Sequence, residues 1–261
     1  MGRDLVGRHV LVCGASKGIG RAAALCIAER GADLTVLARS REPLEALLPE
    51  LRARGATAAR AVAADLDQRD ELDARLGDLI AAEGAIHVVI NNTGGPPGGA
   101  LVDATEAALL RAFERHVLAT HRIMQRVLPG MREAGYGRFI QVLSTSVREP
   151  IPNLGVSNIV RAAVASWAKT LSGELPPGVT INNVLPGFTN TERLEQLAQA
   201  RMGRTGQSHD EVHGEWLGQV PEGRLGRPEE LGAVIAFLAS PAASFVRGTT
   251  LPVDGGRLRS I

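Results

Sequence analysis

Three residue types are scarce in this chain of 261 residues, and each shortage limits what the chain can do. Tyrosine occurs once, at Tyr136, and lysine occurs twice, at Lys17 and Lys169, among 29 basic residues. Two cysteines are too few for a disulfide framework and suit a reducing compartment. No apolar run has the length of a membrane span. We therefore expect a cytoplasmic protein that does not cross a membrane.

The chain also lacks a large excess of either basic or acidic residues. The formal net charge is +1, from 29 basic and 28 acidic residues. Proteins that bind nucleic acid or anionic membranes usually carry a basic excess. We therefore expect neither partner, and we expect no bound metal. Hydrophobic residues make up 44% of the chain, which is enough for one large core.

Short apolar segments alternate with segments of helical periodicity along the chain. The apolar segments are rich in Val and Ile and lack strict alternation, as strands buried on both faces do. We predict strands at His9–Cys13, Asp33–Ala38, Ala59–Ala64, His87–Ile90, Arg138–Leu143, Thr180–Val184 and Thr250–Val253. We predict helices at Arg21–Arg30, Leu44–Arg54, Glu71–Glu83, Thr105–Glu133, Arg161–Leu175 and Glu229–Leu238. This alternation predicts one α/β domain over residues 1–261, with a parallel sheet and right-handed crossovers.

The segment Asn190–Arg227, between the last two predicted strands, is the largest region predicted to be irregular. It is polar and holds several charges. For these reasons we interpret it as a lid or flap over a site rather than as a domain boundary.

A glycine-rich turn follows the first strand and leads directly into a helix. Its residues are Gly14, Ala15, Ser16, Lys17, Gly18, Ile19 and Gly20. Glycines let the backbone approach a pyrophosphate, and the helix N-terminus supplies free N–H groups and a positive dipole end. A tight turn without a ligand would show the same glycines, but the strand–turn–helix context favours a dinucleotide.

The second strand ends at Ala38, Arg39 and Ser40, without the acid that holds the ribose 2′-hydroxyl of NAD. Arg39 and Lys17 are suitably placed to flank a 2′-phosphate, and an arginine can grip a phosphate with two N–H groups. The alternative is that both are solvated surface cations. We predict NADP(H) as the cofactor.

Five motifs in this order resemble the short-chain dehydrogenase/reductase family. They are the glycine turn, Asp65-Leu66, Asn91-Asn92-Thr93-Gly94, the loop that holds Pro186, Gly187 and Thr189, and the closing run from Gly226-Arg227-Pro228 to Asp254-Gly255-Gly256. The resemblance covers nearly the whole chain and is strongest to proteins of the 3-oxoacyl-carrier-protein reductase kind.

The resemblance implies a Rossmann fold with a seven-stranded parallel sheet in the order 3-2-1-4-5-6-7. It implies that Asp65 and Leu66 contact the adenine, and that the nicotinamide half lies against Asn91, Thr93, Gly94, Arg161, Pro186, Gly187 and Thr189. It also implies a small-molecule substrate, expected to be a carbonyl compound. The family's equivalents of Thr105–Glu133 and Arg161–Leu175 form dimer interfaces, so we expect a homodimer or homotetramer.

The chain departs from the family at the catalytic residues. The family uses Asn, Ser, Tyr and Lys, and the matching positions here hold His116, Ser144, Ser157 and Arg161. A phenol, with a pKa of about 10, can be brought toward neutrality by a nearby cation, whereas an aliphatic hydroxyl is a much weaker acid. His116 is the group of this set that titrates near neutrality. The alternative for His116 is a residue that only packs in its helix, and the alternative for Ser157 is a residue that only fills the space of the missing ring.

Three functions stay open at this stage. One is an NADPH-dependent carbonyl reductase in which Ser144 binds the carbonyl oxygen. A second is a protein that binds NADP(H) as a sensor or as a partner subunit without turnover. A third is a non-redox lyase, isomerase or dehalogenase-like enzyme on the same fold.

The substrate pocket is expected to form from loops around the nicotinamide end. These are Gly94–Gly99, Ser146–Pro152 and the part of the flap that carries Arg193, Arg201, His213 and Trp216. Arg148 or a flap arginine could bind an anionic group of the substrate, or could be a solvated cation.

Overall fold

The structure is a computed structural model that describes residues 2–260. Its seven strands form one parallel sheet. The strand order is β3-β2-β1-β4-β5-β6-β7, which confirms the predicted topology. The strands are β1 (His9–Cys13), β2 (Asp33–Ala38), β3 (Ala58–Ala63), β4 (Val88–Asn92), β5 (Gly137–Val142), β6 (Val179–Pro186) and β7 (Thr250–Val253). Every predicted strand forms, with small shifts at the ends of β3 to β6.

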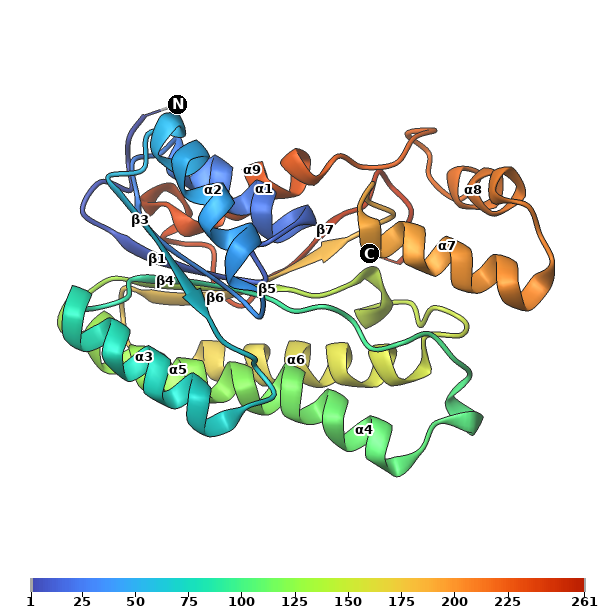
Figure 1. Cartoon of the computed structure of the whole chain (residues 1–261), viewed down its shortest axis with the longest axis horizontal. Helices are drawn as coiled ribbons and strands as arrows, with labels where there is room; N and C mark the ends of the chain where they lie inside the picture. The colour runs from blue at the N-terminus through green and yellow to red at the C-terminus, as the bar shows by residue number, and fades with distance from the viewer. Residues whose placement is uncertain (1, 261) are drawn as a thin grey trace.

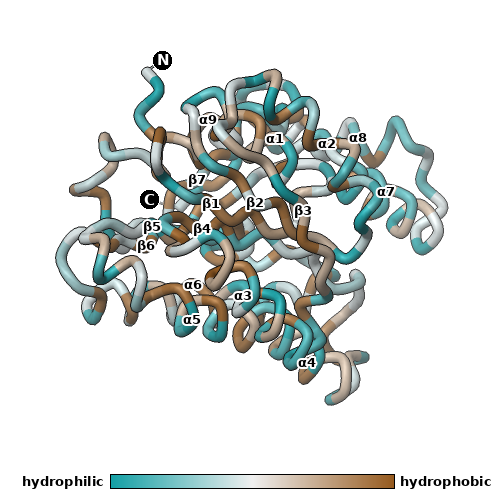
Figure 2. The backbone as a smooth tube through the Cα atoms, turned by 60° about the vertical axis from the view of Figure 1, so that its left-hand side comes forward, coloured by the Kyte–Doolittle hydropathy of each residue, from teal (hydrophilic) through white to brown (hydrophobic). Residues whose placement is uncertain are grey.

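Helices cover both faces of the sheet (Figure 1). One face carries α1 (Gly18–Ala28), α2 (Arg41–Arg54) and α9 (Pro228–Ala239). The other carries α3 (Arg69–Glu83), α4 (Glu106–Phe113), α5 (Ala119–Glu133) and α6 (Gly155–Glu174). Short 3₁₀ helices lie at η1 (Leu101–Asp103), η3 (Thr145–Val147) and η4 (Pro241–Ala243). Figure 2 shows the apolar strands enclosed between these helical layers.

Strand β1 explains why the apolar runs do not alternate. Val10 and Val12 are fully buried in the core cluster under α1, α2 and α9, while Leu11 and Cys13 are fully buried in the cluster on the opposite face. Both faces of a central parallel strand are covered, so every position favours an apolar side chain. Burial raises the pKa of the Cys13 thiol to about 12, so this cysteine stays a neutral core residue.

The predicted helix Thr105–Glu133 is interrupted. A five-residue π-helical segment, η2 (Glu114–Leu118), separates α4 from α5. Such segments displace side chains from regular helical spacing and are frequent at functional sites. His116 and Val117 are the buried residues of this turn.

The prediction that Asn190–Arg227 is irregular is wrong, because two helices form there, α7 (Glu192–Thr205) and α8 (His209–Leu217). Each is short and polar and buries one pair of side chains at i and i+4: Leu194 with Ala198, and Val212 with Trp216. The helix-start signals were present: Thr191 caps α7, and Ser208 forms a capping box in α8. Figure 1 shows both helices extending from one side of the sheet.

Across residues 2–260, no helix combines the length and the apolar character that crossing a bilayer requires.

Candidate active site

A cleft of about 1550 Å³ lies at the carboxyl ends of the strands. The loops that follow β1 and β4 both line it, at the point where the strand order changes direction. Parallel α/β sheets bind ligands at such switch points. The amide of Asn92, at the end of β4, donates to the carbonyl oxygen of Gly14, after β1, at 3.1 Å. This bond joins the two loops that form the floor of the cleft.

The turn after β1 requires its glycines. Gly14 has φ +62°, and a Cβ there would lie 2.2 Å from the carbonyl oxygen of Asn92. A Cβ on Gly20 would lie 2.2 Å from the carbonyl oxygen of Gly14. Gly20 is buried and does not line the cleft, so its role is close packing rather than the cofactor contact we predicted.

The N-terminus of α1 has the features of a phosphate site. Lys17 occupies the N-cap position without a side-chain cap, and the first turn contains no acidic residue. The first N–H groups of Gly18 and its neighbours therefore face the cleft without a side-chain partner, and the helix dipole favours an anion there. The residues present thus fit a dinucleotide pyrophosphate.

Most predicted cofactor-binding residues line this one cleft. They are Gly14, Ser16, Lys17, Gly18, Ile19, Arg39, Ser40, Asp65, Leu66, Thr93, Gly94, Arg161, Pro186, Gly187 and Thr189. Asn91 is the other exception besides Gly20: it is buried in β4, and Asn92 lines the cleft in its place.

Two cations mark the adenine-ribose end. Arg39 is exposed at the end of β2 and has no ion-pair partner among residues 2–260. Lys17 is engaged: its ammonium group forms an ion pair with Glu192, in the first turn of α7. We did not predict this contact across the cleft.

The other end of the cleft holds Ser144, Ser157 and Arg161. The buried Arg161 guanidinium donates to the carbonyl oxygen of Val142 at 2.7 Å and to that of Thr93 at 3.2 Å. Burial, and then the nearby charge of Arg193, lowers the pKa of Arg161 to about 10, so it stays protonated at neutral pH. The Ser144 hydroxyl oxygen accepts from the backbone N–H of Ser146 at 3.1 Å, which leaves its own proton free to donate.

The structure argues against His116 as a catalytic acid. Its side chain is buried and does not line the cleft, and Nδ1 lies 2.8 Å from the Thr93 hydroxyl oxygen. Burial lowers the pKa of His116 to about 3, with smaller contributions from Arg161 and Arg115. A neutral imidazole below the cleft cannot supply an acidic proton at neutral pH. We infer that His116 positions the loop of Thr93.

The single tyrosine lies away from the cleft. The Tyr136 hydroxyl donates to the carbonyl oxygen of Ala239 at 2.6 Å in the core, and its ring lies between the guanidinium groups of Arg8 and Arg138. Burial raises the pKa of this phenol. No phenol therefore reaches the position that Ser157 occupies.

Cations line the outer wall of the cleft beside Ser144. Arg193 donates to the carbonyl oxygen of Pro96 at 2.6 Å, and Arg257 donates to the Thr145 hydroxyl at 2.9 Å and lies over the ring of Phe188. Burial lowers the pKa of both guanidinium groups. Within residues 2–260 neither forms an ion pair with a carboxylate, and both line the cleft.

Of the remaining residues predicted for the substrate pocket, two line the cleft and two do not. Arg201 and Trp216 line the cleft, although Arg201 is paired with Glu215. His213 does not line it, and Arg148 instead donates to the carbonyl oxygen of Thr250 at 3.0 Å.

Comparison with known proteins matches this arrangement. Residues 14–257 fit the family model described as enoyl-(acyl carrier protein) reductase. The chain is 33% identical over 256 residues to the 3-oxoacyl-(acyl-carrier-protein) reductase of Vibrio cholerae serotype O1, covering 97% of this chain and 98% of that protein.

Solved structures agree. The L-sorbose reductase of Gluconobacter frateurii, complexed with NADPH and L-sorbose, superposes with a TM-score of 0.92 at 26% identity over 100% of both chains. YwfH, an NADPH-dependent reductase involved in bacilysin biosynthesis, gives a TM-score of 0.91 at 27% identity, covering 97% of this chain and 99% of that one.

The chain belongs to the short-chain dehydrogenase/reductase family of oxidoreductases, as its motifs predicted. Within that family it is of the 3-oxoacyl-carrier-protein reductase kind.

Proposed function

We propose that this protein is an atypical NADP(H)-dependent reductase of a carbonyl compound. The observation that carries this proposal is the single cleft that holds a phosphate-binding turn at one end and the Ser144, Ser157 and Arg161 side chains at the other. NADP(H) is the cofactor, because the end of β2 lacks the acid that would select NAD, and Arg39 and Lys17 are placed to flank a 2′-phosphate. The NADPH-dependent reductase YwfH and the L-sorbose reductase complexed with NADPH support this choice.

The bound cofactor would supply a hydride to the carbonyl carbon. The chain's own residues then have three tasks. The hydroxyls of Ser144 and Ser157 orient the carbonyl oxygen and donate hydrogen bonds as charge develops on it. Arg161 holds a fixed positive charge behind the site, anchored on the carbonyl oxygens of Val142 and Thr93.

The proton for the new alcohol does not come from a phenol, because Tyr136 is in the core. It does not come from His116, which is neutral and outside the cleft. We infer that water held by Ser157 delivers it, since Ser157 lines the cleft and its hydroxyl has no protein partner within the described chain.

The substrate is inferred to carry an anionic group. Arg193 and Arg257 lie at the substrate end with their charges partly buried, and neither forms an ion pair with a carboxylate among the described residues, although Glu149 and Asp254 act on Arg257 at longer range. Partly buried cations are costly unless an anion pairs with them. A carboxylate or phosphate on the substrate would neutralise both guanidinium charges, and a guanidinium binds such groups with two N–H donors.

A single-turnover experiment tests the proposal. Enzyme saturated with NADPH is mixed with ketones, quinones and 3-oxoacyl thioesters, each class as an anionic member and a neutral member. We expect NADPH absorbance to fall with an anionic carbonyl, and Arg193→Gln to raise KM for it by about tenfold or more, as expected for one charge-assisted hydrogen bond.

Lys169→Gln, on the outer part of α6, is the control, because Lys169 contacts only the carbonyl oxygen of Gly248. NADPH binding without oxidation by any class would favour the sensor or partner-subunit function. Product formed without nicotinamide would favour a non-redox enzyme.

We also propose that the protein is a homodimer or homotetramer. Leu110 and Phe113 on α4 and Ile159 on α6 are large apolar side chains exposed to solvent in the single chain. A symmetric interface would bury them. Analytical ultracentrifugation tests this, and a monomer at all concentrations would contradict it.

A further inference from the structure

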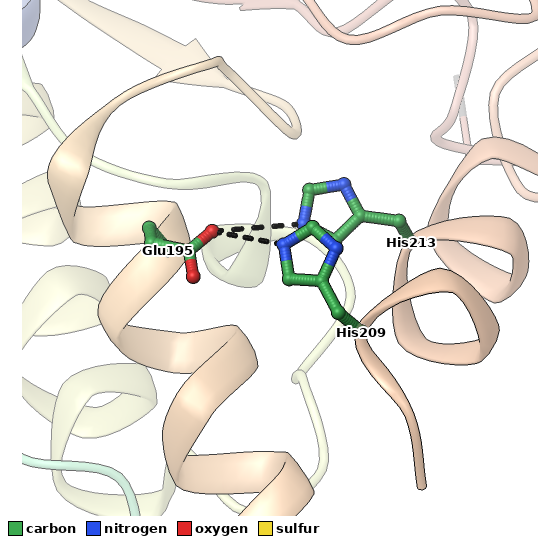
Figure 3. Close-up of side chains that lie close together, drawn as sticks. All are labelled: Glu195, His209 and His213. Carbon is green, nitrogen blue, oxygen red and sulfur yellow. Dashed lines mark hydrogen bonds and ion pairs between the residues drawn. The ribbon is translucent and has the colours of Figure 1, made fainter.

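Three side chains of types that can bind a metal ion converge outside the cleft, between helices α7 and α8 of the flap. They are Glu195 on α7 and His209 and His213 on α8, and their ligand atoms all lie within 4.8 Å of one another. Figure 3 shows the carboxylate directed at both imidazole rings. His209 and His213 are one helical turn apart, so both project from the same face of α8.

The distances fit a tetrahedral ion. A zinc ion binds imidazole nitrogen and carboxylate oxygen at about 2.0–2.2 Å, which places neighbouring ligand atoms about 3.3–3.6 Å apart. The Glu195 oxygen Oε2 lies 3.2 Å from His209 Nε2 and 3.9 Å from His213 Nε2. Small side-chain rotations would bring all three ligand atoms, which lie within 4.8 Å of one another, to one ion.

His213 gives a second, independent indication of a ligand. Its Nε2 atom is buried and has no hydrogen-bond partner. The nearest carboxylate oxygen, at 3.9 Å, is too distant for a hydrogen bond. A buried ring nitrogen that makes no hydrogen bond is unfavourable, and coordination of a cation would satisfy it.

We propose that Glu195, His209 and His213 form a binding site for a divalent ion of the zinc class. Two imidazoles and one carboxylate are a typical donor set for this ion, and a water molecule would take the fourth position. The ion would add a link between α7 and α8 to the hydrogen bond between Glu195 and His209 and to the ion pair between Arg201 and Glu215.

The site is coupled to the cleft by stacked rings. The imidazole of His213 lies 5.2 Å from the ring of Trp216, which stacks on Phe188 at 5.3 Å. Trp216 and Phe188 both line the cleft. Arg193 also lines it and lies two residues before Glu195 in α7. A bound ion would therefore hold the flap as one unit against the substrate end.

Metal titration tests this proposal directly. The full-length protein, freed of any affinity tag and treated with chelator, is titrated with Co²⁺ and with Zn²⁺. We expect one Co²⁺ per chain, with the intense visible bands of tetrahedral coordination, and displacement of those bands by Zn²⁺. We expect His209→Ala and Glu195→Gln each to weaken binding by about tenfold or more. His209 is half-exposed, so its removal should leave the fold intact.

Asp210→Asn is the matched control, because this fully exposed carboxylate lies 3.8 Å from His209 Nδ1, whereas the cluster uses the Nε2 atom of His209. It should bind Co²⁺ as the wild type does. Hydrogen exchange should show slower exchange in α7 and α8 on Zn²⁺ addition, and no change there in His209→Ala. Absence of Co²⁺ binding, or equal binding by His209→Ala and the wild type, would overturn the proposal.

Discussion

Lys17, at the start of α1, forms an ion pair with Glu192, at the start of α7. The contact links the phosphate-binding turn to the flap across the mouth of the cleft. The same ammonium group is the one proposed to face the ribose 2′-phosphate. Flap and cofactor therefore share one cation, and Glu192 brings a negative charge close to a phosphate.

Replacing Glu192 tests this relationship. Glu192→Gln should tighten NADPH binding by about two- to fivefold, because exposed ion pairs of this kind contribute only about 0.5–1 kcal/mol. NADH, which lacks the phosphate, should bind as before. Fluorescence titration measures both constants. Glu106→Gln, another exposed acid in the first turn of a helix, is the control. Weaker NADPH binding in Glu192→Gln would show that the carboxylate itself contacts the cofactor.

Tyr136→Phe separates fold from chemistry. Removing the buried hydroxyl that donates to Ala239 should lower the free energy of unfolding by about 1–2 kcal/mol. Turnover should stay unchanged, since the phenol is remote from the cleft. Urea unfolding and stopped-flow kinetics give the two values. A loss of turnover with normal NADPH affinity would mean that the tyrosine takes part in catalysis.

Ser144→Ala should affect the chemical step. Loss of one hydrogen-bond donor to a developing oxyanion lowers kcat by about 100-fold in comparable sites. The affinity for NADPH should remain, because the phosphate turn is untouched. The hydroxyl of Ser146 is buried and outside the cleft, so Ser146→Ala serves as the control. Equal kinetics for Ser144→Ala and the wild type would remove Ser144 from the mechanism.

His116 should shape the pH dependence of stability. Its pKa is about 3 in the native protein, against about 6.5 when unfolded. Between these values the unfolded chain binds a proton that the native state does not, so stability falls as pH drops below about 6.5, by at most about 1.4 kcal/mol per pH unit. Above that pH the imidazole is neutral in both the native and the unfolded state, so His116 adds no pH dependence to the stability.

His116→Asn should flatten this acid slope, measured by urea unfolding from pH 7 to pH 4. Burial also lowers the pKa of His9 and His87, so part of the slope will remain in the variant. An unchanged slope would contradict the buried neutral imidazole. An ionisation in kcat/KM near neutrality that disappears in the variant would restore His116 as the acid.

The sequence was sufficient for the sheet and the cofactor turn because their signals are local. The central strand β1 is apolar from Val10 to Cys13, and Gly14 is required by a positive φ. It was insufficient for α7 and α8, whose amphipathic faces bury only four side chains in one small cluster. Their helix caps, at Thr191 and Ser208, were the overlooked signal.

Contacts between distant segments could not be predicted. Lys17 and Glu192 are 175 residues apart, and their pairing depends on where the flap folds. The cluster of Glu195, His209 and His213 could not be predicted either, because Glu195 belongs to another helix than the two histidines. The pKa of His116 likewise depends on burial beside Arg161, which only the fold determines.

Calorimetry of cofactor binding tests the central claim most directly. NADPH, titrated into the wild-type protein, should bind at one site per chain and more tightly than NADH. Arg39→Ala should weaken NADPH binding by about 10–100-fold, as expected for a charge-assisted contact to phosphate, and should leave NADH nearly unaffected. Failure of both nucleotides to bind the wild-type protein, or an equal loss for both in Arg39→Ala, would contradict the account.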